Sequence, residues 1–371
     1  MKIAILGTRG IPNHYGGFEQ YAELLAIFLT NQGWDVTVYN SHNHPYQSPE
    51  YKGVKLKHIF DPEKKIGTIG QFIYDLGCIL HTRKQNFDII YQLGYTSSAI
   101  FNFLFPRQSI IVTNMDGMEW KRSKYNKYVQ RFLMFSERIA VKRSDYLIAD
   151  SLGIKEYLDK KYNTDAFFSA YTAELPEAFL QSDLADFSLE PKQYNILVAR
   201  LEPENNVEII MEAHTLNNIQ TPLIVIGNYN TKYGMYLKDK FKNSIHIKFI
   251  GGVYQKAKLD SIRHYSNLYF HGHSVGGTNP SLLEAMACGC NVVANDNIFN
   301  RSVLGDNALY FKDAIGLNEI LLNEKKHSAF FENAKDENIT KIKTIYSENF
   351  IFQTLKEKLI EWHCQNASRI V

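Results

Sequence analysis

The residues best suited to chemistry lie in HGHSVGGTNPSLLEAMACGC, residues 271–290. Gly276 and Gly277 allow the backbone to turn tightly or to approach a ligand closely. Asn279 is a good helix N-cap, and Pro280 suits the first helical position, which tolerates a missing N–H. The N-terminus of such a helix carries free N–H groups and a partial positive charge, so it can bind an anion.

One acid follows this helix start. Glu284 comes just over one turn into the predicted helix, where its carboxylate could accept hydrogen bonds from sugar hydroxyls. A diphosphate at the helix start, from Thr278 to Ser281, and a ribose at Glu284 would explain why these residues are grouped. The alternative is a turn, a cap and a surface glutamate that bind no ligand.

His271 and His273 flank Gly272 at the end of a predicted strand. Because side chains alternate along a strand, both imidazoles would lie on the same side and could form a pair of metal ligands. The sequence offers no third ligand at a suitable spacing. We therefore expect no metal, and we expect His273 to hydrogen-bond near the bound ligand.

The segment TNPSLLEAMACGCNVVA resembles the donor-binding motif of the retaining glycosyltransferases called family 4. The resemblance implies the GT-B fold, in which two Rossmann-like domains face each other across a cleft. It also implies that Glu284 holds the ribose of a nucleotide sugar. The family pattern has an acid near the donor sugar at the position of Gly276, so that contact is missing or comes from Ser274, His273 or a backbone amide.

A second segment, VARLEPENN, resembles the family's strand-end motif G-R-L-x-P-E-K. Arg200 takes the position of the arginine that contacts the donor diphosphate, and its guanidinium can grip a diphosphate in fork geometry. Asn205 takes the lysine position and contributes no charge. The resemblance implies a metal-independent enzyme without a cofactor, in which the nucleotide sugar is a substrate.

The segments GTRGIPNHYGGFE and DGMEWKRSKY resemble a bacterial subgroup identified as rhamnosyltransferases. That resemblance implies a dTDP- or UDP-type donor and a saccharide or lipid-linked saccharide acceptor in surface polysaccharide synthesis. Two rival interpretations stay open at this point. One is a sugar-nucleotide epimerase of the same fold, and the other is a non-catalytic sugar-nucleotide-binding protein.

The glycine-bearing loop of residues 7–17 does not follow the pattern G-x-G-x-x-G, and the second predicted strand ends in asparagine rather than an acid. Both features argue against a nicotinamide dehydrogenase. By the family resemblance, Gly16 and Gly17 would face the donor phosphate and the acceptor. Asp116, or less strongly Glu119, would orient or deprotonate the acceptor hydroxyl. A structural turn and a helix cap are the alternatives for these two segments.

Alternating strand and helix patterns must position these residues. The first strand is predicted at KIAIL and the first helix at about 18–31. The alternation is interrupted at 174–193 and begins again after that segment. We therefore predict an α/β protein with two parallel-sheet domains, 1–173 for the acceptor and 194–346 for the donor. A C-terminal helix at about 347–371 is expected to pack back on the first domain. Ligands should bind beyond the carboxyl ends of the strands.

The composition is typical of a globular protein, with 45% hydrophobic and 22% charged residues, and the net charge of +2 does not suggest nucleic-acid binding. The cysteine spacing predicts neither a metal site nor a disulfide framework. MKIAILG begins as a strand rather than a signal peptide, and no apolar run is long enough to span a membrane. These features predict a cytoplasmic setting.

Residues 121–143 concentrate basic charge, with eight Lys or Arg and one acid, Glu137, interleaved with aromatic and aliphatic residues. One interpretation is an ordinary solvated helix face. The other is a basic amphipathic surface that lies on anionic lipid, which would place the enzyme at the inner face of the plasma membrane.

Overall fold

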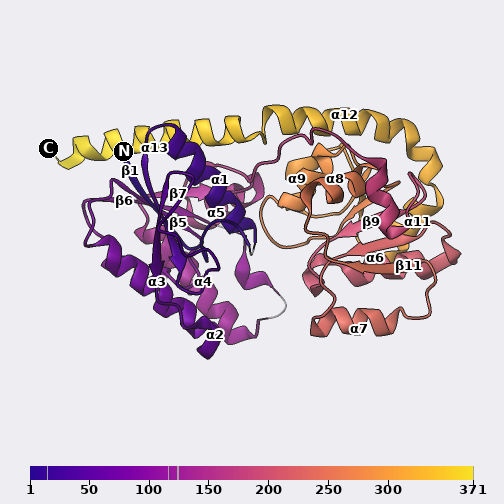
Figure 1. Cartoon of the computed structure of the whole chain (residues 1–371), viewed down its shortest axis with the longest axis horizontal. Helices are drawn as coiled ribbons and strands as arrows, with labels where there is room; N and C mark the ends of the chain where they lie inside the picture. Colours follow the sequence, from indigo (N-terminus) through magenta and orange to yellow (C-terminus); the bar gives the residue numbers. More distant parts are fainter. Residues whose placement is uncertain (15, 116, 123–124, 371) are drawn as a thin grey trace. The chain divides into compact units, whose positions relative to one another are not determined.

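The computed structural model describes residues 1–14, 16–115, 117–122 and 125–370. The chain divides into two compact units, one of Met1–Tyr171 with Glu348–Val371 and the other of Thr172–Ser347 (Figure 1). Each unit contains its own sheet with helices on both faces. The predicted α/β fold with two parallel-sheet units is confirmed.

The first unit holds an eight-stranded sheet of order β3-β4-β2-β1-β5-β6-β7-β8. Its pairs are parallel except for β3 with β4, which form an antiparallel hairpin at one edge. The central strands consist of residues buried on both faces, as parallel sheets require. The strands are β1 (Lys2–Leu6), β2 (Asp35–Ser41), β3 (Glu50–Tyr51), β4 (Val54–Ile59), β5 (Ile89–Leu93), β6 (Ile110–Asn114), β7 (Tyr146–Ala149) and β8 (Phe167–Phe168).

Two helices far apart in sequence share one face of this sheet. The rings of Tyr21 in α1 and Phe352 in α13 lie 5.6 Å apart, and α3 covers the opposite face (Figure 1). The Trp362 ring stacks on Tyr146 at 4.4 Å. The helices are α1 (Gly17–Asn31), α2 (Glu63–Ile66), α3 (Ile69–Thr82), α4 (Lys127–Arg143), α5 (Leu152–Tyr162) and α13 (Glu348–Ile370), with the short 3-10 helices η1 (Ala99–Leu104) and η2 (Glu119–Lys121).

The second unit holds a six-stranded sheet of order β11-β10-β9-β12-β13-β14, in which every pair is parallel. The strands are β9 (Asn195–Val198), β10 (Leu223–Ile226), β11 (Ile247–Gly251), β12 (Tyr269–His271), β13 (Val292–Asn295) and β14 (Leu309–Phe311). The helices α6 (Val207–Thr215) and α11 (Ala314–Leu322) pack on one face, and α8 (Lys256–His264) and α9 (Pro280–Ala287) lie on the other.

The rest of this unit consists of α7 (Lys232–Lys240), α10 (Ile298–Leu304) and α12 (Ser328–Thr344), with 3-10 turns η3 (Gln181–Phe187), η4 (Pro203–Asn205), η5 (Leu216–Asn218) and η6 (Glu324–His327). The η3 turn lies within the predicted break at 174–193, yet it packs on α8. The Ser261 hydroxyl donates to the Asp183 carboxylate at 2.7 Å. Among the described residues, no helix has both the length and the apolarity needed to cross a membrane.

Candidate functional site

The candidate site lies where the strand order of the second sheet reverses. β9 pairs with β10 on one side and with β12 on the other, so the connections leave β9 and β12 in opposite directions. In open parallel sheets, such a switch point leaves a crevice at the carboxyl ends of the strands, and ligands bind there. The loops 199–206 and 272–279 follow these two strands; the first contains Arg200 and Asn205, and the second contains Gly276 and Gly277 and leads into the helix with Glu284.

The two loops are tied to each other through their backbones. The Ser274 amide and hydroxyl donate to the Glu204 carbonyl at 3.0 and 2.7 Å, and the Asn206 side chain donates to the Gly272 carbonyl at 2.8 Å. A Cβ atom on Gly272 would lie only 2.1 Å from the carbonyl oxygen of Asn205. Glycine is therefore required at this point of closest approach.

The second loop leads into the predicted helix N-terminus. Asn279 is the N-cap of α9, and its side chain accepts a hydrogen bond from the Ser281 amide at 2.9 Å. Thr278 is buried, Gly277 is half-buried, and Gly276 has a φ of +126°. A Cβ atom built on Gly276 would meet no atom within 4 Å. The loop thus leaves open space at the position where the resembled family has an acid.

The Glu284 carboxylate is held by a buried cation. Arg263 donates to Glu284 at 2.6 Å and to Asp260 at 3.0 Å, and its side chain is 2% exposed. Burial alone would lower the pKa of Arg263, but the Glu284 carboxylate and other neighbouring acidic groups raise it above its usual value. Arg263 therefore stays charged and fixes the direction in which Glu284 presents its remaining lone pairs.

The first loop places its two predicted residues differently. Arg200 is exposed directly after β9, whereas Asn205 is buried and donates its side-chain amide to the Arg200 carbonyl at 2.8 Å. Asn205, which was predicted to bind the donor, thus has its amide engaged in shaping the loop that carries Arg200.

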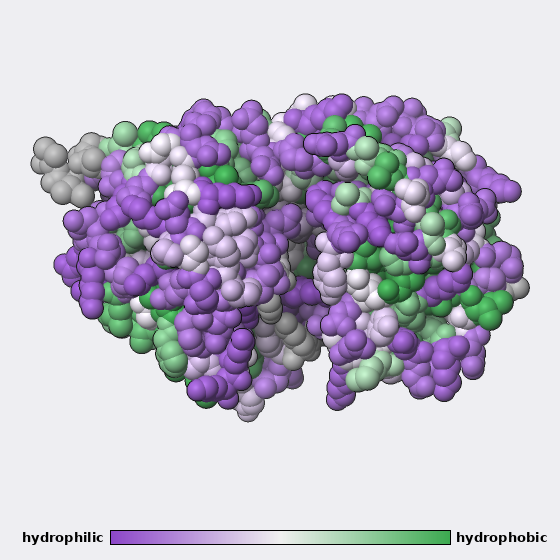
Figure 2. All heavy atoms as spheres, in the orientation of Figure 1, coloured by the Kyte–Doolittle hydropathy of each residue, from purple (hydrophilic) through white to green (hydrophobic). Residues whose placement is uncertain are grey.

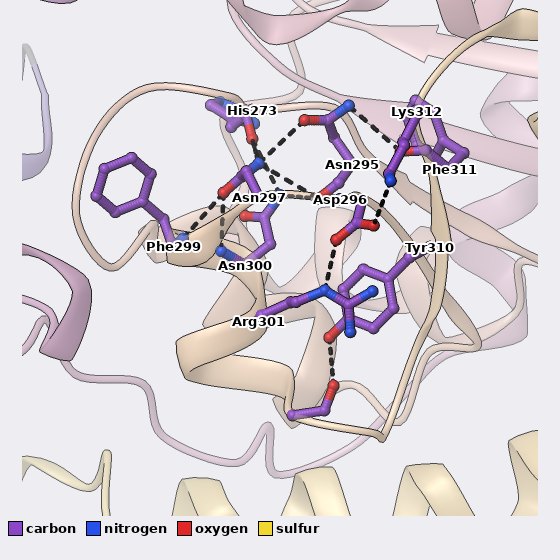
Figure 3. Close-up of polar contacts among 11 residues, drawn as sticks. His273, Asn295, Asp296, Asn297, Phe299, Asn300, Arg301, Tyr310, Phe311 and Lys312 are labelled. Carbon is purple, nitrogen blue, oxygen red and sulfur yellow. Dashed lines mark hydrogen bonds and ion pairs between the residues drawn. The ribbon is translucent and has the colours of Figure 1, made fainter.

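His273 is fixed through its main chain (Figure 3). The side-chain amides of Asn297 and Asn300 donate to the His273 carbonyl at 2.9 and 3.0 Å, and both asparagines belong to the start of α10. The His273 ring stacks on His271 at 4.5 Å, with 14° between the planes. Burial lowers the pKa of His271 well below its usual value, so this imidazole is neutral. The described residues contain no group of three or more His, Cys, Asp or Glu side chains placed to hold a metal ion.

The predicted residues of the first unit also follow strands β1 and β6. Gly16 is the N-cap of α1, and Gly17 is its first residue. The carboxylate of Glu119 in η2 forms an ion pair with Arg122 at 2.6 Å. Asp116 lies outside the described residues.

Three residues of the candidate site were missed in the sequence. Arg263 lies in α8, which contains no recognisable motif. Its role is evident only from the ion pair with Glu284, which is far from it in the sequence. Asn297 and Asn300 lie in the segment NDNIFN, where the density of amide side chains after a strand could have indicated capping and loop support.

Two family models match the chain. Residues 1–174 match a family described as a domain of unknown function (DUF1972), and residues 181–337 match the family described as glycosyl transferases group 1. An uncharacterized glycosyltransferase of Methanocaldococcus jannaschii is 23% identical over 96% of this chain and 99% of that protein.

Solved structures share the fold at low sequence identity. Sucrose-phosphate synthase from Thermosynechococcus elongatus has a TM-score of 0.79 at 14% identity, covering 98% of this chain and 99% of that chain. Anabaena HepE in complex with UDP-glucose has a TM-score of 0.76 at 14% identity, covering 97% and 100%.

These matches decide between the alternatives that the sequence left open. The group 1 match covers the loops 199–206 and 272–279 and the helix that carries Glu284. A transferase is therefore favoured over an epimerase or a non-catalytic binding protein. The chain is a glycosyltransferase with the GT-B fold, and its second unit carries the group 1 domain.

Proposed function

We propose that this chain is a retaining, metal-independent glycosyltransferase of family 4 that uses a sugar linked to a nucleoside diphosphate of the dTDP or UDP type. Rhamnose is the proposed sugar, by resemblance to the bacterial subgroup. The proposed acceptor is a saccharide or lipid-linked saccharide in surface polysaccharide synthesis, at the inner face of the plasma membrane. The structure of HepE with UDP-glucose supports a nucleotide sugar as the donor.

The observation that carries this proposal is the pairing of the α9 N-terminus with Glu284 on the same helix. The Asn279 cap and the residues 276–278 border the helix start, which offers N–H groups and partial positive charge to a diphosphate. One turn further, Glu284 is oriented by Arg263 and partly exposed, so it can accept hydrogen bonds from ribose hydroxyls. The exposed Arg200 supplies the guanidinium.

The chemical requirement is to stabilise the diphosphate as its negative charge grows on departure. Arg200 and the α9 N-terminus would supply donors for that charge without a metal ion, and by the family resemblance the glycine-bearing loop of residues 7–17 would add backbone amides. The acceptor hydroxyl would attack from the face that the diphosphate leaves, through an ion-pair-like state, so the anomeric configuration is retained. Asp116, or Glu119 if its pairing with Arg122 opens, would orient that hydroxyl.

A thermal-shift screen with dTDP, UDP, GDP and ADP, each with and without magnesium, tests the donor site. A diphosphate at about 100 times its dissociation constant should stabilise the protein by roughly 2.7 kcal/mol. We expect a shift with dTDP or UDP that does not need magnesium and that is lost in Arg200→Ala. A strictly magnesium-dependent shift, or no response to any of the four, would contradict the proposed donor site.

A further inference from the structure

The first unit exposes a ridge of aliphatic side chains on α2 and α3. Ile66, Ile69, Ile73 and Leu80 have exposed fractions between 42% and 67%. The last three follow helical spacing along α3, with the half-buried Phe72 and Leu76 beside them. Figure 2 shows hydrophobic atoms in green along the lower edge of the first unit, where Figure 1 places these helices.

Aromatic side chains continue this surface onto η1 and α4. Phe103, Tyr128 and Phe135 are 69%, 82% and 55% exposed. The ring of Phe72 in α3 lies 5.7 Å from that of Phe132 in α4, so the two helices are neighbours. We call the exposed residues of α2, α3, η1 and α4, together with Arg83 and Lys84 directly after α3, the α2–α4 surface.

The charge of this surface has a single sign. Each of the three acids in these helices has a partner within the unit: Glu63, which is 27% exposed, pairs with Arg9 at 2.8 Å, the buried Asp75 accepts from Ser97 at 2.6 Å, and Glu137 is 2% exposed beside Lys161. The basic residues point outward. The exposed cations are Lys64, Lys65, Arg83, Lys84, Lys127, Arg131, Arg138, Lys142 and Arg143.

We infer that the α2–α4 surface docks on an anionic lipid bilayer. Aliphatic and aromatic side chains flanked by cations suit the headgroup boundary, where the apolar groups insert and the cations are attracted to the anionic headgroups. A second copy of this surface would bring like charges together, and a nucleic acid would leave the aliphatic ridge in water. This docking rests on the proposed location at the inner face of the plasma membrane but not on the donor chemistry, and it adds the apolar ridge of α2 and α3 to the basic segment of α4.

Flotation of the full chain with vesicles tests this inference. We expect flotation with phosphatidylcholine vesicles that contain phosphatidylglycerol, weaker flotation at high salt, and little with phosphatidylcholine alone. The double substitution Ile69→Ser with Ile73→Ser should lower bound protein about tenfold, as should Arg131→Glu with Arg138→Glu, because apolar insertion and charge both contribute. Both pairs are exposed, so the variants should fold.

The matched control is Ile315→Ser with Lys325→Glu, two exposed positions in the second unit. It should float like the wild type. The thermal shift with dTDP or UDP should be unchanged in every variant, so failure of docking is distinguishable from failure of the donor site. Equal flotation by all variants, or no flotation by the wild type, would overturn the inference. It would also be overturned if the variants lost nucleic-acid binding or self-association instead of flotation.

Discussion

Arg200 is exposed on the loop 199–206, and the side chain of Asn205 in the same loop helps to fix the loop's conformation. The buried Asn205 amide fixes the Arg200 carbonyl, while the Arg200 side chain stays exposed at the end of β9. We predict that Arg200→Ala lowers turnover by about 100- to 1,000-fold, because one fixed donor to the leaving group is worth roughly 2.7–4 kcal/mol. Steady-state kinetics measure this. The control is Lys325→Ala, which removes the same single positive charge at an exposed position of the second unit. Near-normal turnover in Arg200→Ala would remove Arg200 from the site.

Glu284 is the residue that we propose recognises the ribose rather than the phosphates. We predict that Glu284→Gln weakens binding of dTDP or UDP by about ten- to a hundredfold, because hydrogen bonds to a charged group contribute about 1.5–3 kcal/mol. Binding of inorganic pyrophosphate should stay as in the wild type, because the α9 N-terminus and Arg200 are intact. Calorimetric titration with both ligands checks this. An equal loss for both would mean that Glu284 does not contact the ribose.

Arg263 should matter for stability as well as for binding. Its replacement by methionine would leave the carboxylates of Asp260 and Glu284 without their shared buried partner. We predict that Arg263→Met lowers the free energy of unfolding by about 3–5 kcal/mol. Urea unfolding measures this, and Arg301→Met, which removes a half-exposed ion pair with Asp296, should cost far less. Similar costs for the two variants would contradict a structural role for the Arg263 pair.

At the scale of elements, the loop 272–279 depends on α10. The Asn300 amide donates to the carbonyls of His273 and Asn295 at 3.0 and 2.8 Å, and its side chain is buried (Figure 3). We predict that Asn300→Ala raises the KM for the donor and costs about 1–3 kcal/mol of stability, because the buried acceptors lose their donor. Asn323→Ala, at the half-buried C-cap of α11, is the control. An unchanged donor KM would show that the loop holds its shape without Asn300.

The elements that the sequence predicted well are those with a strong local pattern. The apolar run KIAIL predicted β1, the pattern at about 18–31 predicted α1, and the Asn279-Pro280 pair predicted the start of α9. The short hairpin of β3 and β4 and the role of η3 depend on tertiary packing rather than on local pattern. Tertiary structure also decides the role of Asn205 within the site. Asn205 matches a motif position in the sequence, but its side-chain amide donates a hydrogen bond to the Arg200 carbonyl.

At the scale of the whole molecule, one buried group in each unit, Asp75 in the first and His214 in the second, contributes to stability with the opposite dependence on pH. In the first unit, burial raises the pKa of Asp75 to about 6. The folded state therefore favours the protonated carboxyl, and this contribution is present below the unfolded pKa of about 4 and lost as pH rises through about 6. In the second unit, burial lowers the pKa of His214 to about 4. Its contribution is present above the unfolded pKa of about 6.5 and is lost as pH falls towards 4.

The distribution of tryptophans allows the two units to be followed separately. Trp34, Trp120 and Trp362 all belong to the first unit, so their fluorescence reports its unfolding, whereas far-UV circular dichroism reports both units. Between pH 7.5 and 5, we predict that the first unit gains about 1 kcal/mol from Asp75 and the second loses about 2 kcal/mol from His214. The dichroism transition should therefore begin at a lower temperature than the fluorescence transition at pH 5, with a wider gap than at pH 7.5.

The variant Asp75→Asn assigns the first of these effects. It keeps the size of the side chain and an acceptor for the Ser97 hydroxyl but cannot ionise, so it should raise the fluorescence-detected midpoint at pH 7.5 and leave it almost unchanged at pH 4. The matched control is Asp165→Asn, an exposed acid of the same unit that pairs with Lys155 at the surface. A fluorescence midpoint that falls at pH 7.5 in Asp75→Asn would show that the ionised carboxylate stabilises the first unit, opposite to the direction that its burial implies.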